Sequence, residues 1–214
     1  MIKKFLINDY QKEELFKIFT KEAGSILSLA HPNIVNYMGC CKDREDDLCL
    51  VSEYCSDGNL YNLLHDKAKE LTLSTRISIL SDIATALTFL HSQKRPIIYK
   101  DLKSCNVLID RKGDKIVAKL SEFDISGFIS SIHCSNNILW SSPEVLRSES
   151  IGVEVDVYSF GILIWEVFAR EVPFKETNDQ LYLMGNIIKG ARPDLSMLDG
   201  QTPEDIIVLM KNCW

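Results

Sequence analysis

Residues 73–91, LSTRISILSDIATALTFLH, restrict the possible fold of this chain more than any other segment. Their apolar positions recur at intervals of three and four residues, which is the spacing that places side chains on one face of an α-helix. These positions are Ile77, Leu80, Ile83, Ala84, Leu87 and Leu90. We therefore expect a long helix that buries one face, within a larger helical part of the molecule.

The segments before this helix are shorter and favour strands. Residues 1–7 alternate loosely between polar and apolar side chains. Residues 33–41 and 48–55 are short runs of β-branched or apolar residues, and the polar turn 42–47 between them predicts a hairpin. Residues 10–30 have the spacing of an amphipathic helix, although a glycine interrupts it.

The pattern predicts an α+β fold with two lobes. Residues 106–123 predict two more short strands around an Asp-Arg-Lys-Gly turn, and the remainder of the chain is helical. We expect a small, β-rich first lobe at residues 1–54, a linker at 55–59 and a larger, mainly α-helical lobe at 60–214. A cleft between two lobes of this kind is a natural site for a small molecule.

The charge and the cysteines exclude several classes of function. A formal net charge of −6 gives no support for a surface that binds nucleic acid or anionic membranes. We expect no membrane span, because the longest apolar candidate, residues 151–168, is interrupted by three acids. The N-terminus has no long apolar core or cleavage site of a signal peptide. Seven cysteines without a C-x-x-C pair favour reduced thiols, so we expect a cytoplasmic protein.

The segment 97–110, IIYKDLKSCNVLID, places an acid and an amide five residues apart with a lysine between them. Other segments accompany it in a fixed order, namely HPNIV at 31–35, LCLVSEYCSDGNL at 48–60, WSSPEVL at 140–146 and DVYSFGILIWEV at 156–167. In this order and spacing they resemble a protein kinase domain over essentially the whole chain. The amino-acid sequence of these segments is most similar to serine/threonine kinases of the tyrosine-kinase-like group. Tyr99, in place of the usual loop histidine, is also similar to the leucine-rich-repeat (Roco-type) kinases.

The resemblance implies a bilobal protein-kinase fold and a chemical activity. The activity is transfer of a phosphoryl group from ATP, with Mg²⁺, to serine or threonine of a protein. The implied partners are a protein substrate or a signalling protein, with no nucleic acid beyond the nucleotide. The oligomeric state is not implied.

The resemblance also implies two residues that hold the phosphates. Lys3 corresponds to the strand lysine that contacts the α- and β-phosphates, and Lys4 is the competing choice. We prefer Lys3, because Ile2 and Phe5 then occupy the apolar flanks. Glu22 corresponds to the helix glutamate that orients this lysine.

Four residues correspond to the adenine-binding region of the family. Ser52 occupies the gatekeeper position at the start of the hinge between the lobes. Backbone groups of Glu53 and Cys55 are expected to meet the edge of adenine, and Leu108 is expected to pack beneath its ring. Backbone contacts depend little on side-chain identity, so the assignment of Glu53 and Cys55 is insensitive to substitution and also weakly diagnostic.

The segment 97–110 resembles the catalytic loop H-R-D-L-K-x-x-N. Asp101 is then the residue that orients the substrate hydroxyl and accepts its proton, and Lys103 neutralises charge on the transferred phosphoryl group. Asn106 and Glu122 are the implied magnesium ligands. Asp156 corresponds to the acid that ties down the backbone of the catalytic loop.

Several features depart from the family pattern. The chain begins at or just before the third strand and ends before the last helix, so we expect a kinase domain truncated at both ends, without a G-x-G-x-x-G loop. The D-F-G position has the sequence Glu122-Phe123-Asp124, and Lys100 replaces the loop arginine. Two alternatives to an active kinase therefore stay open, a pseudokinase that serves as an interaction scaffold and an inactive fragment.

Overall fold

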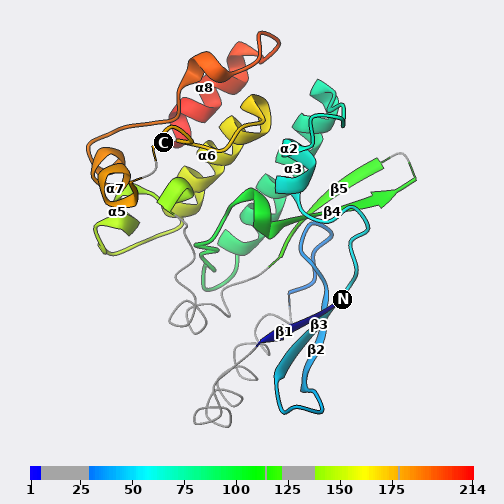
Figure 1. The fold of residues 1–214 in the computed structure, drawn as a ribbon. Coiled ribbons are helices and arrows are strands. Elements are labelled where there is room, and N and C mark those ends of the chain that lie inside the picture. The colour runs from blue at the N-terminus through cyan, green and yellow to red at the C-terminus, as the bar shows by residue number, and fades with distance from the viewer. Residues whose placement is uncertain (6–28, 114, 122–137, 178) are drawn as a thin grey trace.

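The computed structural model describes residues 1–5, 29–113, 115–121, 138–177 and 179–214. A small antiparallel sheet stands at one end of the molecule, and helices form the other end (Figure 1). The sheet has the order β1-β3-β2. Its strands are β1 (Ile2–Phe5), β2 (Tyr37–Lys42) and β3 (Leu48–Ser52). The helix expected at 10–30 falls almost wholly outside the described residues.

The hairpin predicted from residues 33–55 is confirmed. β2 and β3 pair antiparallel, and the amide of Asp43 donates to the carbonyl of Asp47 at 2.9 Å to close the turn. The other side of β3 pairs with β1, so that Lys3 lies opposite Leu50 and Lys4 opposite Cys49. Because neighbours in a strand point to opposite faces, Lys3 and Lys4 emerge on different sides of this sheet.

The larger part of the chain consists of helices around one hairpin. The hairpin is β4 (Val107–Lys112) paired with β5 (Lys115–Leu120), as predicted from residues 106–123. The α-helices are α2 (Leu60–His65), α3 (Leu73–His91), α5 (Pro143–Leu146), α6 (Glu154–Ala169), α7 (Gln180–Ile188) and α8 (Glu204–Cys213). The short 3-10 turns are η2 (Ser104–Asn106), η3 (Ile138–Trp140) and η4 (Leu195–Met197).

The long helix predicted at 73–91 is confirmed as α3. It begins after Thr72, whose side chain accepts a hydrogen bond from the amide of Thr75. Its buried positions are Ile79, Leu80, Ile83, Ala86, Leu87 and Leu90. The expectation for Ile77 was wrong, because this side chain is 42% exposed. Ile77 lies about 120° around the helix from the centre of the buried stripe, at 100° per residue.

Helix α6 is buried along most of its length. Besides its apolar residues, it buries the side chains of Asp156 and Glu166 completely. It packs against α8, and the two helices run side by side in Figure 1. Gly161 permits this close approach, since a Cβ atom there would lie 2.7 Å from Cβ of Cys213. The helix therefore forms the centre of the larger lobe and carries two acids into it.

By length and apolar composition, α3 could cross a membrane, and it is the one helix among the described residues that meets this test. The expectation that the chain has no membrane span stays a prediction, because this test considers length and composition alone. In the structure, α3 packs against β5 and α6, and its buried stripe belongs to the main hydrophobic core. Core helices pass the same test of length and composition, so the match is weak evidence for a membrane span.

The burial difference along α3 generates a prediction. We expect Ile79→Ala to lower the free energy of unfolding by about 3 kcal/mol, because it leaves a cavity beneath a fully buried side chain. Ile77→Ala on the same helix is the matched control and should change stability by less than about 1 kcal/mol. Urea unfolding of both variants measures this. Equal losses would contradict the assignment of the buried stripe.

Candidate active site

The catalytic loop lies between α3 and β4 and is fixed by one buried carboxylate. Asp156 accepts hydrogen bonds from the backbone amides of Tyr99 and Lys100, each at 2.8 Å. Nε2 of His91 lies 2.7 Å from the same carboxylate. Lys100 has a φ of 68°, a left-handed conformation that is uncommon outside glycine and that the two amide bonds hold in place. The anchoring role expected for Asp156 is confirmed.

Tyr99 links this loop to the strand that precedes the D-F-G position. Its ring is almost completely buried, and its hydroxyl donates to the carbonyl oxygen of Ser121. Ser121 in turn donates twice to the carbonyl oxygen of Asn106, from its hydroxyl at 2.8 Å and from its amide at 2.9 Å. Loop and strand are thus connected through three residues.

The structure brings Asp101, Lys103 and Asn106 together. Nδ2 of Asn106 donates to Oδ2 of Asp101 at 2.7 Å and to the carbonyl of Asp101 at 2.9 Å. Nζ of Lys103 lies 3.1 Å from the same Oδ2. All three side chains are buried or largely shielded, which strengthens charged hydrogen bonds. The arrangement holds a carboxylate in one orientation next to a fixed positive charge.

The donor set of Asn106 fits a magnesium ion. Its amide nitrogen is used by Asp101, so its amide oxygen is the atom that can bind a cation, and oxygen is the ligand that Mg²⁺ prefers. Glu122, the second expected ligand, lies outside the described residues, as does Glu22.

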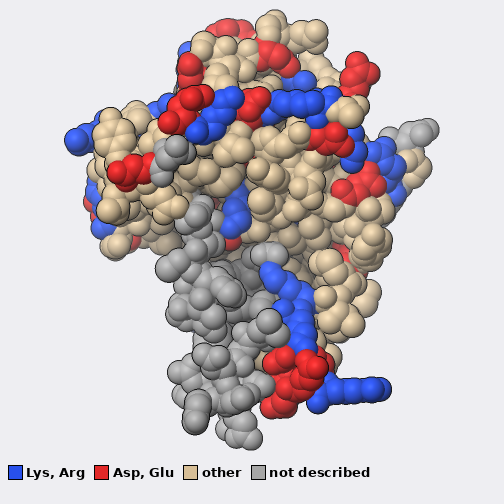
Figure 2. Space-filling view, viewed as in Figure 1, with Lys and Arg blue, Asp and Glu red and all other residues tan. Residues whose placement is uncertain are grey.

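The small sheet separates the two candidate phosphate lysines. On the face of Lys4, the turn between β2 and β3 presents Asp43 and Asp47, whose oxygens lie 2.7 and 3.0 Å from Nζ of Lys4. Together with Glu45, these carboxylates raise the pKa of Lys4. Figure 2 shows acidic side chains gathered at the far end of the small sheet, with basic side chains beside them. Lys4 is thus held in a surface ion cluster.

Lys3 occupies the other face of the sheet. Its partner in the register, Leu50, belongs to the main hydrophobic core, and Ser52 follows two residues later on the same face. This face therefore carries the candidate gatekeeper together with Lys3. The position favours Lys3 over Lys4 as the residue directed toward a nucleotide.

Three of the four candidate adenine contacts lie along the connection between the lobes, and the fourth, Leu108, lies on β4 beside it. Ser52 is buried at the end of β3, and the Glu53 amide donates to the carbonyl of Asn36 at 2.9 Å. The Glu53 carboxylate bonds Nζ of Lys119 at 2.7 Å, so this side chain is used within the protein. Burial raises the pKa of the Cys55 thiol to about 11. Leu108 lies half-buried on β4 and forms a bridge with Asn59.

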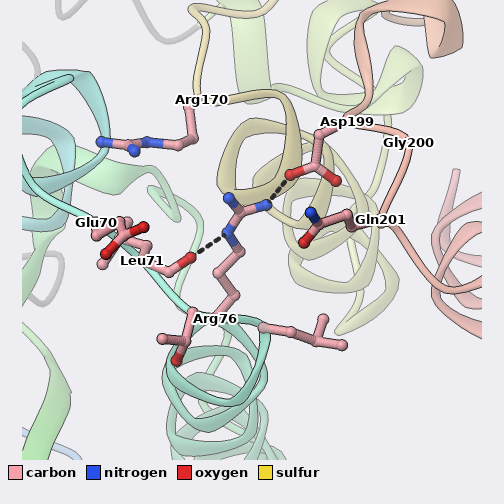
Figure 3. Close-up of a pocket in the computed structure, with 9 residues that line it drawn as sticks. Glu70, Leu71, Arg76, Arg170, Asp199, Gly200 and Gln201 are labelled. Carbon is pink, nitrogen blue, oxygen red and sulfur yellow. Dashed lines mark hydrogen bonds and ion pairs between the residues drawn. The ribbon is translucent and has the colours of Figure 1, made fainter.

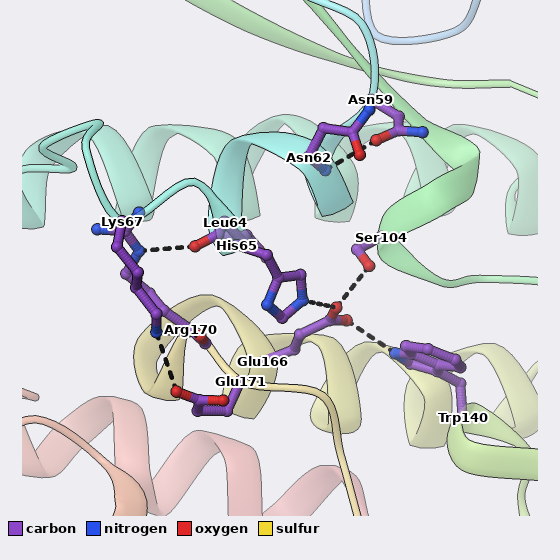
Figure 4. A network of polar contacts seen from close by, with 10 residues as sticks. All are labelled: Asn59, Asn62, Leu64, His65, Lys67, Ser104, Trp140, Glu166, Arg170 and Glu171. Atoms are coloured by element: carbon purple, nitrogen blue, oxygen red, sulfur yellow. Dashed lines mark hydrogen bonds and ion pairs between the residues drawn. The ribbon is translucent and has the colours of Figure 1, made fainter. Parts of the chain in front are cut away.

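A second buried carboxylate, Glu166, was not recognised from the sequence as a functional residue. Its Oε1 accepts from Oγ of Ser104 at 2.5 Å, and its Oε2 accepts from Nε1 of Trp140 at 2.9 Å. Nε2 of His65 lies 3.4 Å from Oε1 (Figure 4). Glu166 therefore connects the catalytic loop, η3 at the start of the WSSPEVL segment, and α2. The signal that could have found it is a carboxylate inside an otherwise apolar helix.

The larger lobe also contains a cavity of about 540 Å³ at the start of α3, away from the catalytic loop. Figure 3 shows Arg76 between its two partners in this cavity. Nε of Arg76 donates to the carbonyl of Leu71 at 3.2 Å, and Nη1 pairs with Asp199. Arg170 donates to the carbonyl of Leu64 at 2.9 Å. Both guanidinium groups are thus engaged by partners within the protein.

A family model described as protein tyrosine and serine/threonine kinase matches residues 1–214. The chain therefore belongs to the protein tyrosine and serine/threonine kinase family, and its fold is the bilobal protein-kinase fold expected from the sequence. "Probable serine/threonine-protein kinase pats1" of Dictyostelium discoideum is 35% identical over 213 residues, or 97% of this chain. Two further relatives come from the same organism. "Cyclic GMP-binding protein C" is 34% identical over 94% of this chain, and "Probable serine/threonine-protein kinase drkA" is 36% identical over 76%.

This chain spans a small part of these relatives, namely 6% of pats1, 8% of cyclic GMP-binding protein C and 25% of drkA. The resemblance to serine/threonine kinases of the tyrosine-kinase-like group is confirmed by further relatives of that type. One is "Serine/threonine-protein kinase CTR1" of Arabidopsis thaliana, which is 33% identical over 217 residues. The similarity to leucine-rich-repeat kinases that Tyr99 suggests stays a prediction.

The Glu166 network generates a second prediction. We expect Glu166→Gln to lower the free energy of unfolding by about 2 kcal/mol, because an amide nitrogen would replace one buried acceptor oxygen opposite a donor. Glu171→Gln is the control, since Glu171 pairs with Lys67 and Lys175 near the surface, where ion pairs contribute at most about 1 kcal/mol. Denaturant unfolding compares the two. A smaller loss for Glu166→Gln than for Glu171→Gln would contradict the network.

Proposed function

We propose that this chain transfers the γ-phosphoryl group of ATP to serine or threonine hydroxyls of a protein substrate. The observation that carries the proposal is the carboxylate of Asp101, which lies 2.7 Å from Nδ2 of Asn106 and 3.1 Å from Nζ of Lys103. The loop that carries these residues is anchored by Asp156. Family membership supports it, because phosphoryl transfer needs positioned charges rather than a covalent intermediate on the protein. The serine/threonine kinase relatives, and Lys103 two residues after Asp101, favour an aliphatic hydroxyl as the acceptor.

Each residue of the loop has a separate role in this mechanism. Asp101 receives the hydrogen bond of the substrate hydroxyl, orients its oxygen and accepts its proton as the oxygen attacks. Asn106 keeps the Asp101 carboxylate in place through its amide nitrogen. Lys103 carries a positive charge within 3.1 Å of the carboxylate and stabilises the negative charge of the transferred group.

The remaining proposed residues bind the nucleotide. ATP supplies the phosphoryl group when bound, and Mg²⁺ neutralises its charge. Lys3, oriented by Glu22, would hold the α- and β-phosphates, and Asn106 with Glu122 would hold the metal. Backbone groups of Glu53 and Cys55 would bind the adenine edge beside Ser52 and above Leu108. Cys55 supports this, since no hydrogen bond of its amide occurs within the described parts of the chain.

A second candidate function is a pseudokinase that binds a signalling partner. The sequence Glu122-Phe123-Asp124 favours it, because the longer acid displaces its carboxylate by about 1 Å, and such a misplacement can cost on the order of 100-fold in rate. In either case we propose a cytoplasmic protein that acts on or with another protein, in which α3 stays in the core of the larger lobe.

The role of Asp101 generates a third prediction. We expect Asp101→Asn to reduce incorporation of labelled phosphate into a protein substrate by at least about 100-fold, because the amide cannot accept the hydroxyl proton. The variant should keep the thermal stability of the parent chain, since the amide still accepts from Asn106. Equal incorporation by both proteins would identify the activity as a contaminant. Absent incorporation by the parent chain, with ATP binding retained, would favour the pseudokinase.

The two lysines generate a fourth prediction. In a thermal shift assay with ATP and Mg²⁺, Lys3→Met should lose most of the stabilisation by nucleotide. Lys4→Met is the matched control, and it should keep this stabilisation, because it removes ion pairs with Asp43 and Asp47 on the other face of the sheet. A loss confined to Lys4→Met would overturn the assignment of Lys3.

A further inference from the structure

Two cysteines face each other across the small sheet. In the register of β2 and β3, Cys41 lies directly opposite Cys49. Directly opposed residues of antiparallel strands have Cα atoms about 4.5–5.5 Å apart, which falls within the range of about 4.4–6.8 Å found for disulfides. Both thiols are free in the structure. The backbone thus already satisfies the distance condition for a bond between them.

The two thiols differ in their exposure. Cys41 is exposed, whereas Cys49 is buried, with its Sγ 3.8 Å from the carbonyl oxygen of Asp47. Burial raises the pKa of Cys49, and nearby acids contribute in the same direction. Because Cys41 is the exposed thiol, a dissolved oxidant reaches it first. The sulfur of Cys49, directly opposite in the register, is the one placed to bond the oxidised Cys41 sulfur.

The adjacent cysteine, Cys40, provides an internal contrast. It lies opposite Leu50 and packs against the main core, on the face of the sheet that also carries Lys3. Since successive side chains of a strand alternate between faces, Cys40 and Cys49 point to opposite sides of the sheet. The pairing is therefore specific to one of the two neighbouring cysteines.

We propose that Cys41 and Cys49 are a site of reversible oxidation, at which a hydroperoxide converts the two thiols into an intrachain disulfide. Hydrogen peroxide oxidises the Cys41 thiol to a sulfenic acid and is itself reduced to water. The Cys49 sulfur then attacks the Cys41 sulfur, the S–S bond forms, and the sulfenic hydroxyl leaves as a second water with the Cys49 proton. A thiol reductant such as glutathione returns both cysteines to the reduced form.

This inference goes beyond the proposed phosphoryl transfer and does not depend on it. The bond would close the hairpin around the acidic turn that holds Lys4, on the face of the sheet opposite Lys3 and Ser52. Because the Cys41 sulfur is exposed to dissolved thiols, the bond would form under oxidant and be reduced again in a reducing cytoplasm.

The test is peroxide treatment of the folded full chain, followed by thiol blocking, digestion without reductant and mass spectrometry. We expect a linked peptide pair containing Cys41 and Cys49, lighter than the two thiol peptides by two hydrogen atoms and abolished by dithiothreitol. Cys41→Ser should abolish this pair. Cys40→Ser, the matched control next to it, should leave it unchanged.

Two results would overturn the proposal. One is oxidation of Cys41 to sulfinic acid without linkage to Cys49. The other is a linked pair that survives Cys41→Ser, with Cys40 in its place. Treatment of the chain in urea is a further comparison, in which the specific pair should give way to mixed linkages that include Cys55 and Cys105. Identical linkages in folded and unfolded chain would also contradict a site created by the strand register.

Discussion

The buried carboxylate of Asp156 is the interaction on which the rest of the candidate site depends. A charged group without solvent is strongly unfavourable unless hydrogen bonds replace its hydration. Here two backbone amides of the catalytic loop and one histidine ring replace it. The same bonds hold Lys100 in a left-handed conformation that the chain would rarely adopt alone. Asp101 is the next residue, so the two amide bonds also fix the backbone from which the proposed catalytic base extends.

Helix α6 supplies a second anchor of the same kind. Glu166 lies ten residues after Asp156, about 15 Å further along the helix axis. Its partner Ser104 stands between Lys103 and Asn106 in the sequence, so the loop is held from one helix near both of its ends. Because α6 is buried and packs closely on α8 at Gly161, these two acids have little freedom to move. A rigid α6 therefore holds the loop residues that bond Asp156 and Glu166 in fixed positions.

The spacing of apolar residues in the sequence was sufficient to predict the strands and the long helix. Buried side chains recur every two residues in a strand and every three or four in a helix, so each element has its own pattern. The spacing was not sufficient where partners are distant in sequence. Glu166 interrupts an apolar helix, and the interruption alone does not reveal Ser104 or Trp140 as donors. Ile77 matched the spacing of the apolar residues in α3 but lies outside the stripe that the fold covers. Only the packed structure identifies which side of a helix is buried.

In the small sheet, too, the sequence alone does not show which side chains face the core. Lys3 and Lys4 are identical neighbours, as are Cys40 and Cys41, and composition cannot separate the members of either pair. The pleat does so, because it sends one member of each pair toward the core and the other toward the acidic turn. A shift of the register by one residue would exchange these environments completely. The pairing of β3 with its two neighbours, rather than the identity of the residues, therefore decides which lysine shares a face with Ser52 and which cysteine lies opposite Cys49.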